Sequence, residues 1–476
     1  MTENKTADTA SSGMESTIPP QVIGAVLAAG IMSFCGVIVE TAMNITFPTL
    51  MKEFRVGTDS VQWMTTLYLL VVASITPLSA ALKRRFTDRT LFLWANLLFL
   101  VGVLIDGMAG HFWLLLLGRA VQGLGTSIAL PLMFNIILDK VPARRIGTMM
   151  GVGTLITAIG PAVGPTFGGL VSTTIGWRFI FVFLVPVLLA SLILGLVCIR
   201  AKPAFHQAAG LNPVDVLLIV LSFSGLIFAI SNASAGALSW RFTGSLSVGI
   251  ASMTWFIYRS IHQNKPVIDM RLFTDQLFSL HVCAYILYEV CALALSFILP
   301  NYIQLVNGRN ALQAGLIVLP GAALGAVLAP LSGRIYDQLG ARVPILSGSL
   351  ISMIGLAGFA LFGRRLSDGL IIVLYICFML GIGLSFGNIM TNGLRQLTQG
   401  EQTDGNAIFN TVQQFAAALG SSTAATLVSA GQAAETSQRL GTIEGSWHTF
   451  VLLVVLGFAE TALAFILTVR RRSAYR

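Results

Sequence analysis

Long apolar segments recur along the whole chain and limit its fold more than any other feature of the sequence. A helix needs about 20 mostly apolar residues to cross the hydrocarbon core of a bilayer. Fourteen such segments are present, with short connections between them. The sequence therefore predicts an all-α membrane protein with fourteen transmembrane helices and no soluble domain. The predicted spans are 22–48, 59–81, 91–109, 112–137, 147–170, 177–199, 213–233, 242–258, 277–301, 311–333, 343–362, 369–392, 407–430 and 448–469.

The positive charge of the chain follows the predicted membrane topology. There are 29 Lys and Arg against 20 Asp and Glu, which gives a net charge of +9. If both termini are cytoplasmic, the cytoplasmic segments hold 20 of the 29 basic residues, the external loops hold eight, and Arg119 lies within a span. This asymmetry agrees with the positive-inside rule and indicates an even number of spans. We therefore expect a multi-pass protein of the bacterial cytoplasmic membrane and no nucleic-acid partner.

Two loops in opposite halves of the chain have similar sequences. Residues 77–89 read PLSAALKRRFTDR and residues 330–342 read PLSGRIYDQLGAR, and they align without a gap. Many transporters are built from parallel halves related by an axis along the membrane normal. The repeat predicts six-helix bundles at 21–200 and 276–470, separated by a linker with two inserted transmembrane helices at 201–275. The predicted cytoplasmic tails are 1–20 and 471–476. The first tail is polar and lacks a signal-peptide pattern, and we expect it to be disordered.

Glycine and proline recur within residues 151–170 at a spacing that is unusual for a soluble helix. Three glycines at i, i+4 and i+8 form a smooth stripe that another helix can approach closely; they are Gly160, Gly164 and Gly168. Pro161 and Pro165 break the hydrogen-bond ladder, which a membrane helix tolerates where protein or a water-filled cavity satisfies the freed groups. We expect a bent helix at a moving contact. The alternative is that these glycines serve helix packing only.

Two ionisable residues are expected at similar depth in the first and fourth spans. With a rise of about 1.5 Å per residue, Glu40 lies about 12 Å below the end of its span at Pro48, and Arg119 lies about 10 Å past Phe112. Charged residues at such depths are costly and usually face a cavity or a partner. An opposite charge favours the carboxylate form of Glu40 and burial favours the neutral form, so this pair predicts a site of proton exchange. The alternative is a static buried ion pair.

Other polar residues at membrane depth are candidates for the same cavity. Glu289, near the midplane of the ninth span, is a candidate for a second proton site or a substrate carboxylate, and the alternative is a buried, hydrogen-bonded glutamate. Asp106 lies near a predicted helix end, where we expect solvent to reach it. Amides at this depth bind substrate or cross-link helices, and the sequence does not separate these roles. The candidates for lining a substrate cavity are Asn44, Gln122, Tyr302, Gln304, Asn392, Asn410, Gln413 and Glu460.

Several of these motifs resemble those of the drug:proton antiporters in the major facilitator superfamily. The run Gly160-Pro161-x-x-Gly164-Pro165-x-x-Gly168-Gly169 resembles their fifth-helix motif. The run around Glu40 resembles their first-helix motif, in which the acid is usually Asp. The run around Arg119 resembles their fourth-helix motif, whose Arg is assigned to proton transfer. The resemblance covers nearly the whole chain, and the two extra spans resemble the fourteen-helix branch of the family.

The second loop resembles the loop motif of the superfamily more closely than the first. The matching residues of the second copy are Gly333, Asp337, Gly340 and Arg342. The first copy has Ala80, Arg84 and Thr87 where Gly, Asp and Gly are usual, which resembles the lincomycin-resistance-type branch. The resemblance implies a gating role for the loops, including Arg85 and Arg89, if Asp88 substitutes for the missing Asp. The alternative for the first copy is a solvated basic turn.

The resemblance implies a multidrug exporter that moves lipophilic, cationic or zwitterionic compounds by alternating access against inward proton flow. Its partners would be the small substrate, protons as the coupling ion and the bilayer, and we expect a monomer without a cofactor or metal. One alternative is proton-coupled export of an endogenous lipid, peptide or amino acid, and another is a non-transporting sensor. An enzyme is not expected, because the sequence has no nucleophile–base pair, metal-ligand spacing or phosphate-binding loop.

Overall fold

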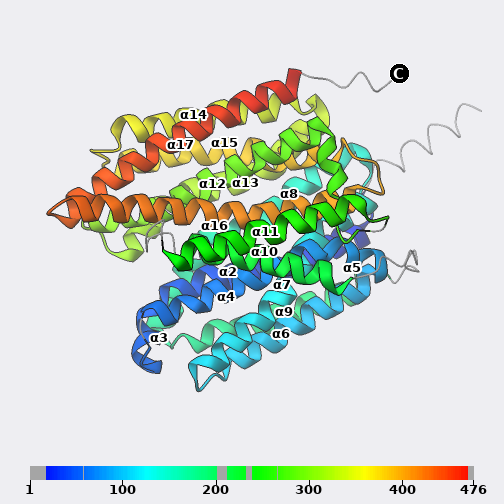
Figure 1. Cartoon of the computed structure of the whole chain (residues 1–476), viewed down its shortest axis with the longest axis horizontal. Coiled ribbons are helices and arrows are strands. Elements are labelled where there is room, and N and C mark those ends of the chain that lie inside the picture. The colour runs from blue at the N-terminus through cyan, green and yellow to red at the C-terminus, as the bar shows by residue number, and fades with distance from the viewer. Residues whose placement is uncertain (1–17, 57, 201–211, 232–238, 265, 470–476) are drawn as a thin grey trace, which may run out of the picture.

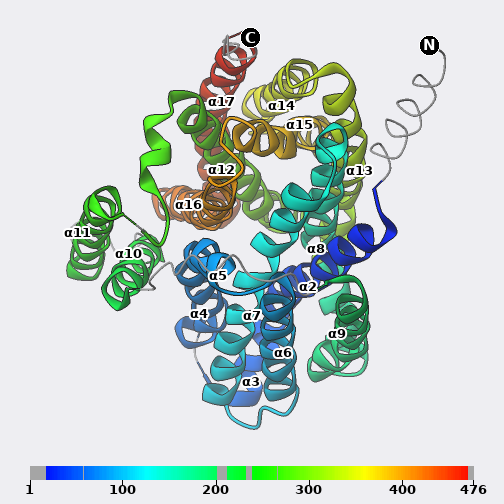
Figure 2. The same cartoon turned by 90° about the vertical axis from the view of Figure 1, so that its right-hand side faces the viewer.

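The long helices form two groups that lie side by side, with a helix hairpin outside both (Figure 1; Figure 2). The computed structural model describes residues 18–56, 58–200, 212–231, 239–264 and 266–469. The N-terminal bundle contains α2 (Pro20–Ile45), α4 (Thr58–Ile75), α6 (Asp88–Gly107), α7 (Phe112–Lys140), α8 (Ile146–Thr174) and α9 (Arg178–Cys198). The C-terminal bundle contains α12 (Gln276–Leu305), α13 (Ala311–Leu339), α14 (Arg342–Phe362), α15 (Asp368–Leu394), α16 (Gln402–Ala434) and α17 (Gln438–Val469).

Shorter elements connect these helices. The short α3 (Phe47–Phe54) follows α2, and α4 continues through η1 (Thr76–Leu78) into α5 (Ser79–Arg85). η2 (Ala143–Arg145) precedes α8, and η4 (Met270–Thr274) precedes α12. The hairpin consists of α10 (Pro213–Ser231) and α11 (Trp240–His262), which pack mainly on each other and touch the bundles through α4 and α16. Asp215 at the start of α10 is buried and pairs with Arg259 of α11 at 2.6 Å.

Eleven of the described helices are long and apolar enough to cross a membrane, and α8 makes 12 when its two bent halves are taken as one span. The helices α11 and α16 occupy two further predicted spans but are more polar. The polar residues of α16 include a run of amides and serines, and several are buried against α12, α17 and α7. The all-helical multi-span architecture is confirmed, and the count of fourteen spans stays a prediction.

Two ends of the molecule are distinguished by their loops. We call the end that carries residues 83–89, 139–146 and 395–402 the basic end, and the opposite end, which carries α3, the far end. One buried apolar cluster extends through the N-terminal bundle and continues into the C-terminal bundle towards the basic end, where it includes Ala80 and Leu138 on one side and Phe278 and Leu394 on the other. A second cluster lies in the C-terminal bundle alone, towards the far end. The bundles therefore share a packed core only towards the basic end.

The glycine stripe of α8 packs against α2. Cβ atoms on Gly160 and Gly164 would meet Val37 and Thr41, and a Cβ on Gly168 would come within 2.7 Å of Ala42 Cα. The stripe lies within the N-terminal bundle and does not form the contact between the bundles, so the moving contact expected there stays a prediction.

The bend of α8 lies within the residues of that stripe, whereas the interbundle contact of the helix lies nearer the basic end. The helix bends by 40° between Pro161 and Thr166, as expected for a proline-interrupted span. Pro161 is exposed and Gly169 is half-buried, and the side chain of Pro165 lies outside the described structure. Near the basic end α8 packs on α13, where a Cβ on Gly151 would come within 2.9 Å of Pro330 Cα.

We expect Gly168→Val to destabilise the contact between α2 and α8. The new side chain would overlap the backbone of Ala42, which cannot move without displacing α2. Overpacking of this kind costs about 1–3 kcal/mol. The melting temperature of the purified protein in detergent should fall, whereas Gly369→Val should have little effect because a Cβ there meets nothing within 4 Å. Equal melting temperatures for the two variants would contradict the close contact.

Candidate functional site

Arg119 is the centre of a buried polar cluster in the N-terminal bundle. Its side chain has 0% exposure, and its guanidinium carbon lies 4.2 Å from the ring centroid of Tyr68 on α4. Nε donates to the carbonyl of Met64 at 3.4 Å, and Nη1 donates to Gln122 Oε1 at 2.9 Å. The Tyr68 hydroxyl donates to Thr126 at 3.0 Å. Helices α4 and α7 together hold the guanidinium in one orientation.

Glu40 lies close enough to Arg119 for their charges to interact, as the sequence predicted. The ion pairs of the described residues do not include Glu40 with Arg119, so their contact is electrostatic and not direct. Glu40 is only half-buried, whereas Arg119 is inaccessible. Thr41, the next residue, donates to the carbonyl of Gly160 at 3.4 Å, which holds α8 beside this turn of α2. Access to water therefore distinguishes the acid from its cationic neighbour.

Asp106 is buried in the same cluster, and the expectation that solvent reaches it is wrong. It has 0% exposure and accepts a hydrogen bond from Gln122 Nε2 at 2.7 Å. Its position one residue before the end of α6 suggested solvent, but α7 covers that turn of the helix. The sequence alone gives no signal for this, because the covering residues belong to the next helix and the contact depends on helix packing.

The C-terminal bundle contains a second carboxyl near mid-membrane. Glu289 on α12 is 9% exposed and accepts from Gln413 Nε2 of α16 at 3.5 Å. Tyr285, one turn earlier, stacks on Phe386 with ring centroids 4.2 Å apart and meets the Phe409 ring edge-on at 5.1 Å. No Lys or Arg of the described chain pairs with Glu289. The two bundles thus differ, because Arg119 lies near the buried acids of the N-terminal bundle, whereas no Lys or Arg of the described chain pairs with Glu289.

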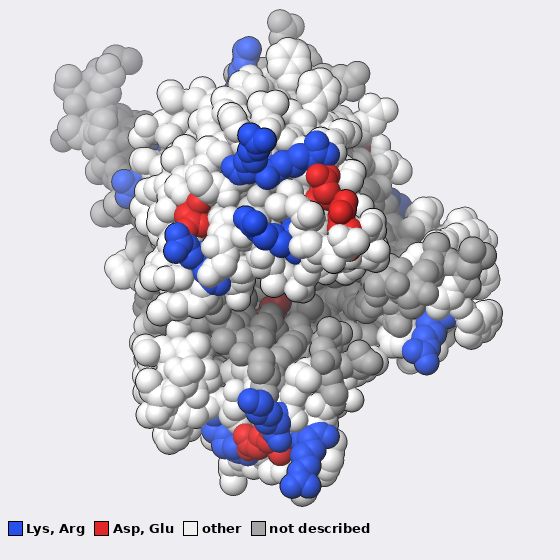
Figure 3. Space-filling view, turned by 90° about the vertical axis from the view of Figure 1, so that its left-hand side faces the viewer, with Lys and Arg blue, Asp and Glu red and all other residues white. Residues whose placement is uncertain are grey.

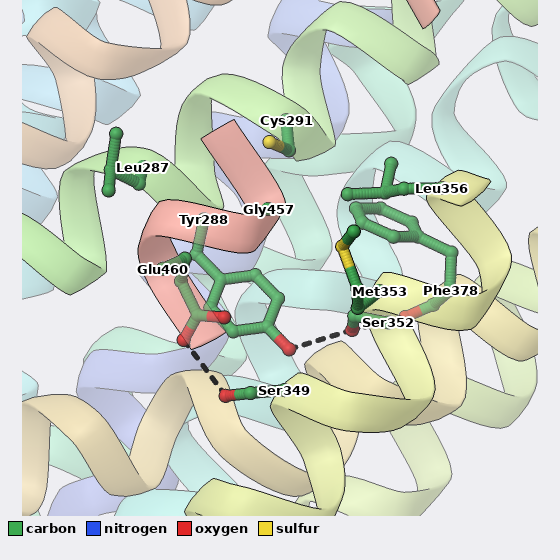
Figure 4. A pocket seen from close by; sticks show the side chains of 10 residues that line it. All are labelled: Leu287, Tyr288, Cys291, Ser349, Ser352, Met353, Leu356, Phe378, Gly457 and Glu460. Carbon is green, nitrogen blue, oxygen red and sulfur yellow. Dashed lines mark hydrogen bonds between the residues drawn. The ribbon is translucent and has the colours of Figure 1, made fainter. Parts of the chain in front are cut away.

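Glu460 lies inside the C-terminal bundle, among α12, α14 and α17 (Figure 4). Ser349 Oγ lies 2.9 Å from its Oε1, and the Tyr288 hydroxyl lies 2.7 Å from both Ser352 and Ser385. A cavity of about 10 Å³ adjoins these groups, and it is about large enough for one water molecule. The pocket is too small for a drug-sized ligand, so the expectation that Glu460 lines a substrate cavity is corrected.

The other predicted cavity residues divide into several structural roles. Tyr302 is buried in the apolar core of the C-terminal bundle and accepts from the Leu366 amide at 3.3 Å, so it does not line a cavity mouth as expected. Gln304 is exposed and bonds to the Pro300 carbonyl of its own helix. The side chain of Asn44 lies outside the described structure.

The remaining amides cross-link helices near the basic end. Asn392 bonds to His281 at 2.7 Å and accepts from Tyr336 at 3.1 Å. Asn410 donates to Asn406 at 2.7 Å, and Asn406 donates across the bundles to Asn135 at 2.9 Å. These contacts agree with the cross-linking alternative for Asn392, whereas Asn410 bonds within its own helix to Asn406, which makes the contact across the bundles.

The second loop copy joins the two bundles at the basic end. Asp337 at the end of α13 accepts from the backbone amides of Gly147 and Thr148 at 2.9 and 2.8 Å, and from the Thr148 hydroxyl at 2.8 Å. These groups form the first turn of α8, where the helix dipole favours an anion. Gly333 lies against Gly147, and Gly340 ends α13 with a φ of 80°, a conformation that favours glycine. Arg342 is exposed.

The first loop copy joins the bundles with the charges reversed. Arg84 aligns with Asp337, and its Nη1 donates to both carboxylate oxygens of Asp404 at 2.9 and 2.7 Å. Asp404 lies in the first turn of α16, at the position that Thr148 occupies in α8. Burial raises the pKa of the Asp404 carboxyl above its ordinary value, although the Arg84 guanidinium acts against that rise. An anion therefore lies at the helix N-terminus in both copies, but in the first copy the helix supplies it.

Asp88 does not substitute for the missing loop Asp. It pairs with Lys140 at 2.8 Å and lies 3.9 Å from Lys83, and both contacts stay within the N-terminal bundle. Arg85 is exposed with its guanidinium 5.6 Å from the Phe86 ring, and Arg89 is half-buried. The first copy is therefore not only a solvated basic turn, because Arg84 crosses to the other bundle.

The bundles separate towards the far end. All hydrogen bonds between the bundles in the described ranges lie in their basic-end halves: Arg84 to Asp404, Asp337 to Gly147 and Thr148, Arg395 to the Ala143 carbonyl, and Asn406 to Pro131 and Asn135. Figure 3 shows the far end, where the surface recedes between the bundles and an acidic side chain is visible at depth. The molecule is therefore closed at the basic end.

Comparison with known proteins identifies the family. The family model of the Major Facilitator Superfamily matches residues 29–421. The chain belongs to the major facilitator superfamily. Lincomycin resistance protein LmrB of Listeria monocytogenes is 35% identical over 90% of this chain and 91% of its own length. LmrB of Bacillus subtilis is 35% identical over 89% and 88%. The Multidrug resistance protein B homolog of Mycobacterium tuberculosis is 27% identical over 84% of this chain and 75% of its own.

Solved structures of the major facilitator superfamily share the fold. The human organic anion transporter MFSD10 superposes with a TM-score of 0.66 at 14% identity, over 94% of this chain and all of that chain. The proton:xylose symporter XylE superposes with a TM-score of 0.64 at 12% identity, over 92% and 95%. At such low identity these similarities establish the fold alone. The chain is thus a multi-pass membrane transporter of this superfamily, and members are in general not enzymes.

We expect Arg84→Ala to separate the bundles at the basic end. The buried Asp404 carboxylate would lose two charged hydrogen bonds, each worth about 1.5–3 kcal/mol. Spin labels at Arg144→Cys and Gln338→Cys, which are exposed positions on the two bundles, would report the change as a longer distance in a background without native cysteines. Lys83→Ala is the matched control, because Lys83 pairs with Asp139 within the N-terminal bundle.

A charge redesign tests the relation between the two loop copies. Arg84→Asp alone places two carboxylates together and should open the basic end further. Adding Asp404→Thr recreates the arrangement of Asp337 with Thr148, so the label distance should return towards that of the unmodified protein. A double variant as open as Arg84→Asp alone would show that the two contacts are not equivalent.

Proposed function

We propose that this chain is a proton-coupled drug exporter that works by alternating access. The observation that carries the proposal is the cluster in which buried Arg119 lies within electrostatic range of half-buried Glu40. Ionisable groups at this depth are retained mainly where a charge must move or a substrate must bind. The names of the relatives, lincomycin resistance and multidrug resistance proteins, support a drug as the transported compound.

Glu40 is the residue that takes up and releases the proton. Its partial exposure gives it access to water, whereas Arg119 is fully enclosed and keeps its charge. When Glu40 is ionised, the guanidinium stabilises it, and when Glu40 is neutral, its desolvation cost is relieved. Movement of the bundles would change which side of the membrane supplies the proton.

Lipophilic cationic or zwitterionic compounds are the proposed substrates. Glu289 is a carboxyl group without a basic partner among the described residues, and the Tyr285 ring one turn earlier stacks on Phe386. A carboxylate with aromatic neighbours attracts an organic cation through charge and through the faces of the rings. Gln413, which bonds Glu289 in this conformation, would exchange that bond for the substrate.

The proposed topology has fourteen spans with both termini and the basic end in the cytoplasm. The distribution of Lys and Arg supports this orientation, and α11 and α16 complete the count. In this orientation the structure is closed towards the cytoplasm, and its recessed face is external. The two bundles would act as the moving units, with Arg84–Asp404 and the Asp337 contact as gates on the cytoplasmic side.

Transport by the purified protein tests the proposal directly. The chain is reconstituted in liposomes, a proton gradient is imposed, and accumulation of a lipophilic cation and of lincomycin is followed in parallel. We expect accumulation that needs the gradient and stops when a protonophore is added. Accumulation that does not depend on the gradient would refute proton coupling. If neither the lipophilic cation nor lincomycin accumulates, but lipids or peptides are taken up, the alternative cargo would be favoured.

We expect Glu40→Gln to abolish gradient-driven accumulation. The amide has nearly the same shape but cannot exchange a proton, so coupling is lost while exchange of substrate down its own gradient continues. Accumulation should fall by at least about tenfold, equivalent to about 1.4 kcal/mol. Glu444→Gln is the matched control, because this half-buried glutamate pairs with Arg364 at the far end. Wild-type accumulation and pH dependence in Glu40→Gln would contradict the assignment.

We expect Glu289→Gln to weaken the transport of cations while leaving proton coupling intact. The concentration for half-maximal transport of a permanent cation should rise by about tenfold, which corresponds to about 1.4 kcal/mol. A neutral substrate should be affected much less, because it gains nothing from the carboxylate. Equal losses for charged and neutral substrates would assign Glu289 to structure or to proton coupling instead.

A further inference from the structure

Helices α6 and α7 pack closely, and glycines at their contact leave room for a carboxyl group inside the N-terminal bundle. A Cβ on Gly118 would overlap Asp106 Oδ1, and a Cβ on Gly102 would come within 2.6 Å of Gln122 Cγ. Small residues at a helix contact allow the backbones to approach and polar side chains to meet. Because glycine has no side chain, Gly102 and Gly118 leave the space that Asp106 and Gln122 fill.

Gln122 joins Asp106 to Arg119 without contact between the two charges. Its Nε2 donates to Asp106 Oδ2 at 2.7 Å and its Oε1 accepts from Arg119 Nη1 at 2.9 Å. A side-chain amide is neutral and offers a donor and an acceptor together, so it can connect an anion to a cation. All three side chains have 0% exposure. Asp106 Oδ1 and Arg119 Nη2 have no hydrogen-bond partner in the described part of the chain, so neither side chain is fully satisfied.

Arg119 consequently lies between two carboxyls of different accessibility. Both Glu40 and Asp106 interact with its charge. Glu40 is partly open to water, but Asp106 is enclosed by α6 and α7. Glu40, the accessible acid, is suited to exchange a proton. Asp106, the enclosed acid, is suited to keep its protonation state while that exchange takes place.

We propose that Asp106 is a positioning residue that balances part of the charge of Arg119 through Gln122 and thereby sets the pH at which Glu40 exchanges its proton. This inference rests on the proposed proton coupling at Glu40. A buried cation that loses its only counter-charge is strongly unfavourable. Because Asp106 remains, Glu40 can become neutral without leaving Arg119 uncompensated.

Few other ionisable groups face this cluster from the helices packed around it. The described part of α8 has none, and the remaining ones on α6, α7, α9 and α16 lie at helix ends. Arg178 of α9 is held by Glu53 and the Ala109 carbonyl at the far end. Among the side chains that the structure describes, the ionisable ones on the surrounding helices are Cys35 and Glu40 of α2, Tyr68 of α4, Asp88, Arg89 and Asp106 of α6, Arg119, Asp139 and Lys140 of α7, Arg178 and Cys198 of α9, and Asp404 of α16.

The pH profile of transport in liposomes tests the role of Asp106 with three nearly isosteric variants. Asp106→Asn removes the balancing charge, so Arg119 holds Glu40 ionised more strongly and the midpoint should move to lower pH by on the order of one unit. Gln122→Glu adds a negative charge beside Arg119, so the midpoint should move to higher pH. In the double variant Asp106→Asn/Gln122→Glu the carboxylate and the amide exchange places, and the midpoint should return towards wild type.

Several results would overturn the proposal. One is an Asp106→Asn profile reduced equally at every pH with an unchanged midpoint, which is the result of a purely structural role. If Asp106→Asn does not fold, the other two variants test the proposal. Gln122→Glu must then shift the midpoint of the pH profile to higher pH, and the double variant must reverse that shift. Asp368→Asn at the far end, where Asp368 pairs with Arg309, is the control and should not shift the midpoint.

Failure of this inference is distinguishable from failure of the proposed function. If wild-type transport shows no dependence on pH or on an imposed proton gradient, proton coupling itself is refuted. If wild-type transport depends on pH and Glu40→Gln removes that dependence, but the three variants leave the midpoint unchanged, only the role of Asp106 is refuted.

Discussion

The buried positive charge of Arg119 is the constraint on which the arrangement of the N-terminal bundle depends. A guanidinium without access to water needs acceptors, counter-charges or aromatic faces around it, and here each neighbouring helix contributes one. α4 provides the Tyr68 ring and the Met64 carbonyl, α7 provides Gln122, and α2 brings Glu40 into electrostatic range. Glycines allow α2 to approach α8 and α6 to approach α7. Without this close packing, these groups would not reach the Arg119 guanidinium.

The two loop copies show how one geometrical requirement is met by opposite charges. An α-helix that begins at the boundary between the bundles presents unpaired amides and the positive end of its dipole, which favour an anion. In one copy the loop provides that anion through Asp337, and in the other the helix carries its own, Asp404, so the loop residue must be a cation. The departure of the first loop from the family pattern is therefore compensated on α16, more than 300 residues away along the chain.

The C-terminal bundle differs from the N-terminal bundle in chemistry although both have the same helix order. Glu289 and Glu460 are bonded to neutral partners, Gln413 and Ser349, and no basic residue of the described chain pairs with either. A carboxyl with a fixed cation and a carboxyl with only neutral neighbours respond differently to protons and to a charged ligand. In the proposed function, the N-terminal bundle exchanges the proton and the C-terminal bundle contributes to recognition of the substrate.

The sequence by itself determined the membrane class, the repeat and the bend of α8, because these follow from local composition and spacing, and helical rise was enough to predict that Glu40 and Arg119 lie near each other. It also identified Asp337, whose role depends on a short contiguous motif. Only the tertiary structure decided that Asp106 is buried, that the glycine stripe faces α2, that Tyr302 lies in a packed core and that Arg84 meets Asp404. The physical reason is the same in each case: burial and pairing depend on which helix covers a given face, and that is set by contacts between segments far apart in the chain.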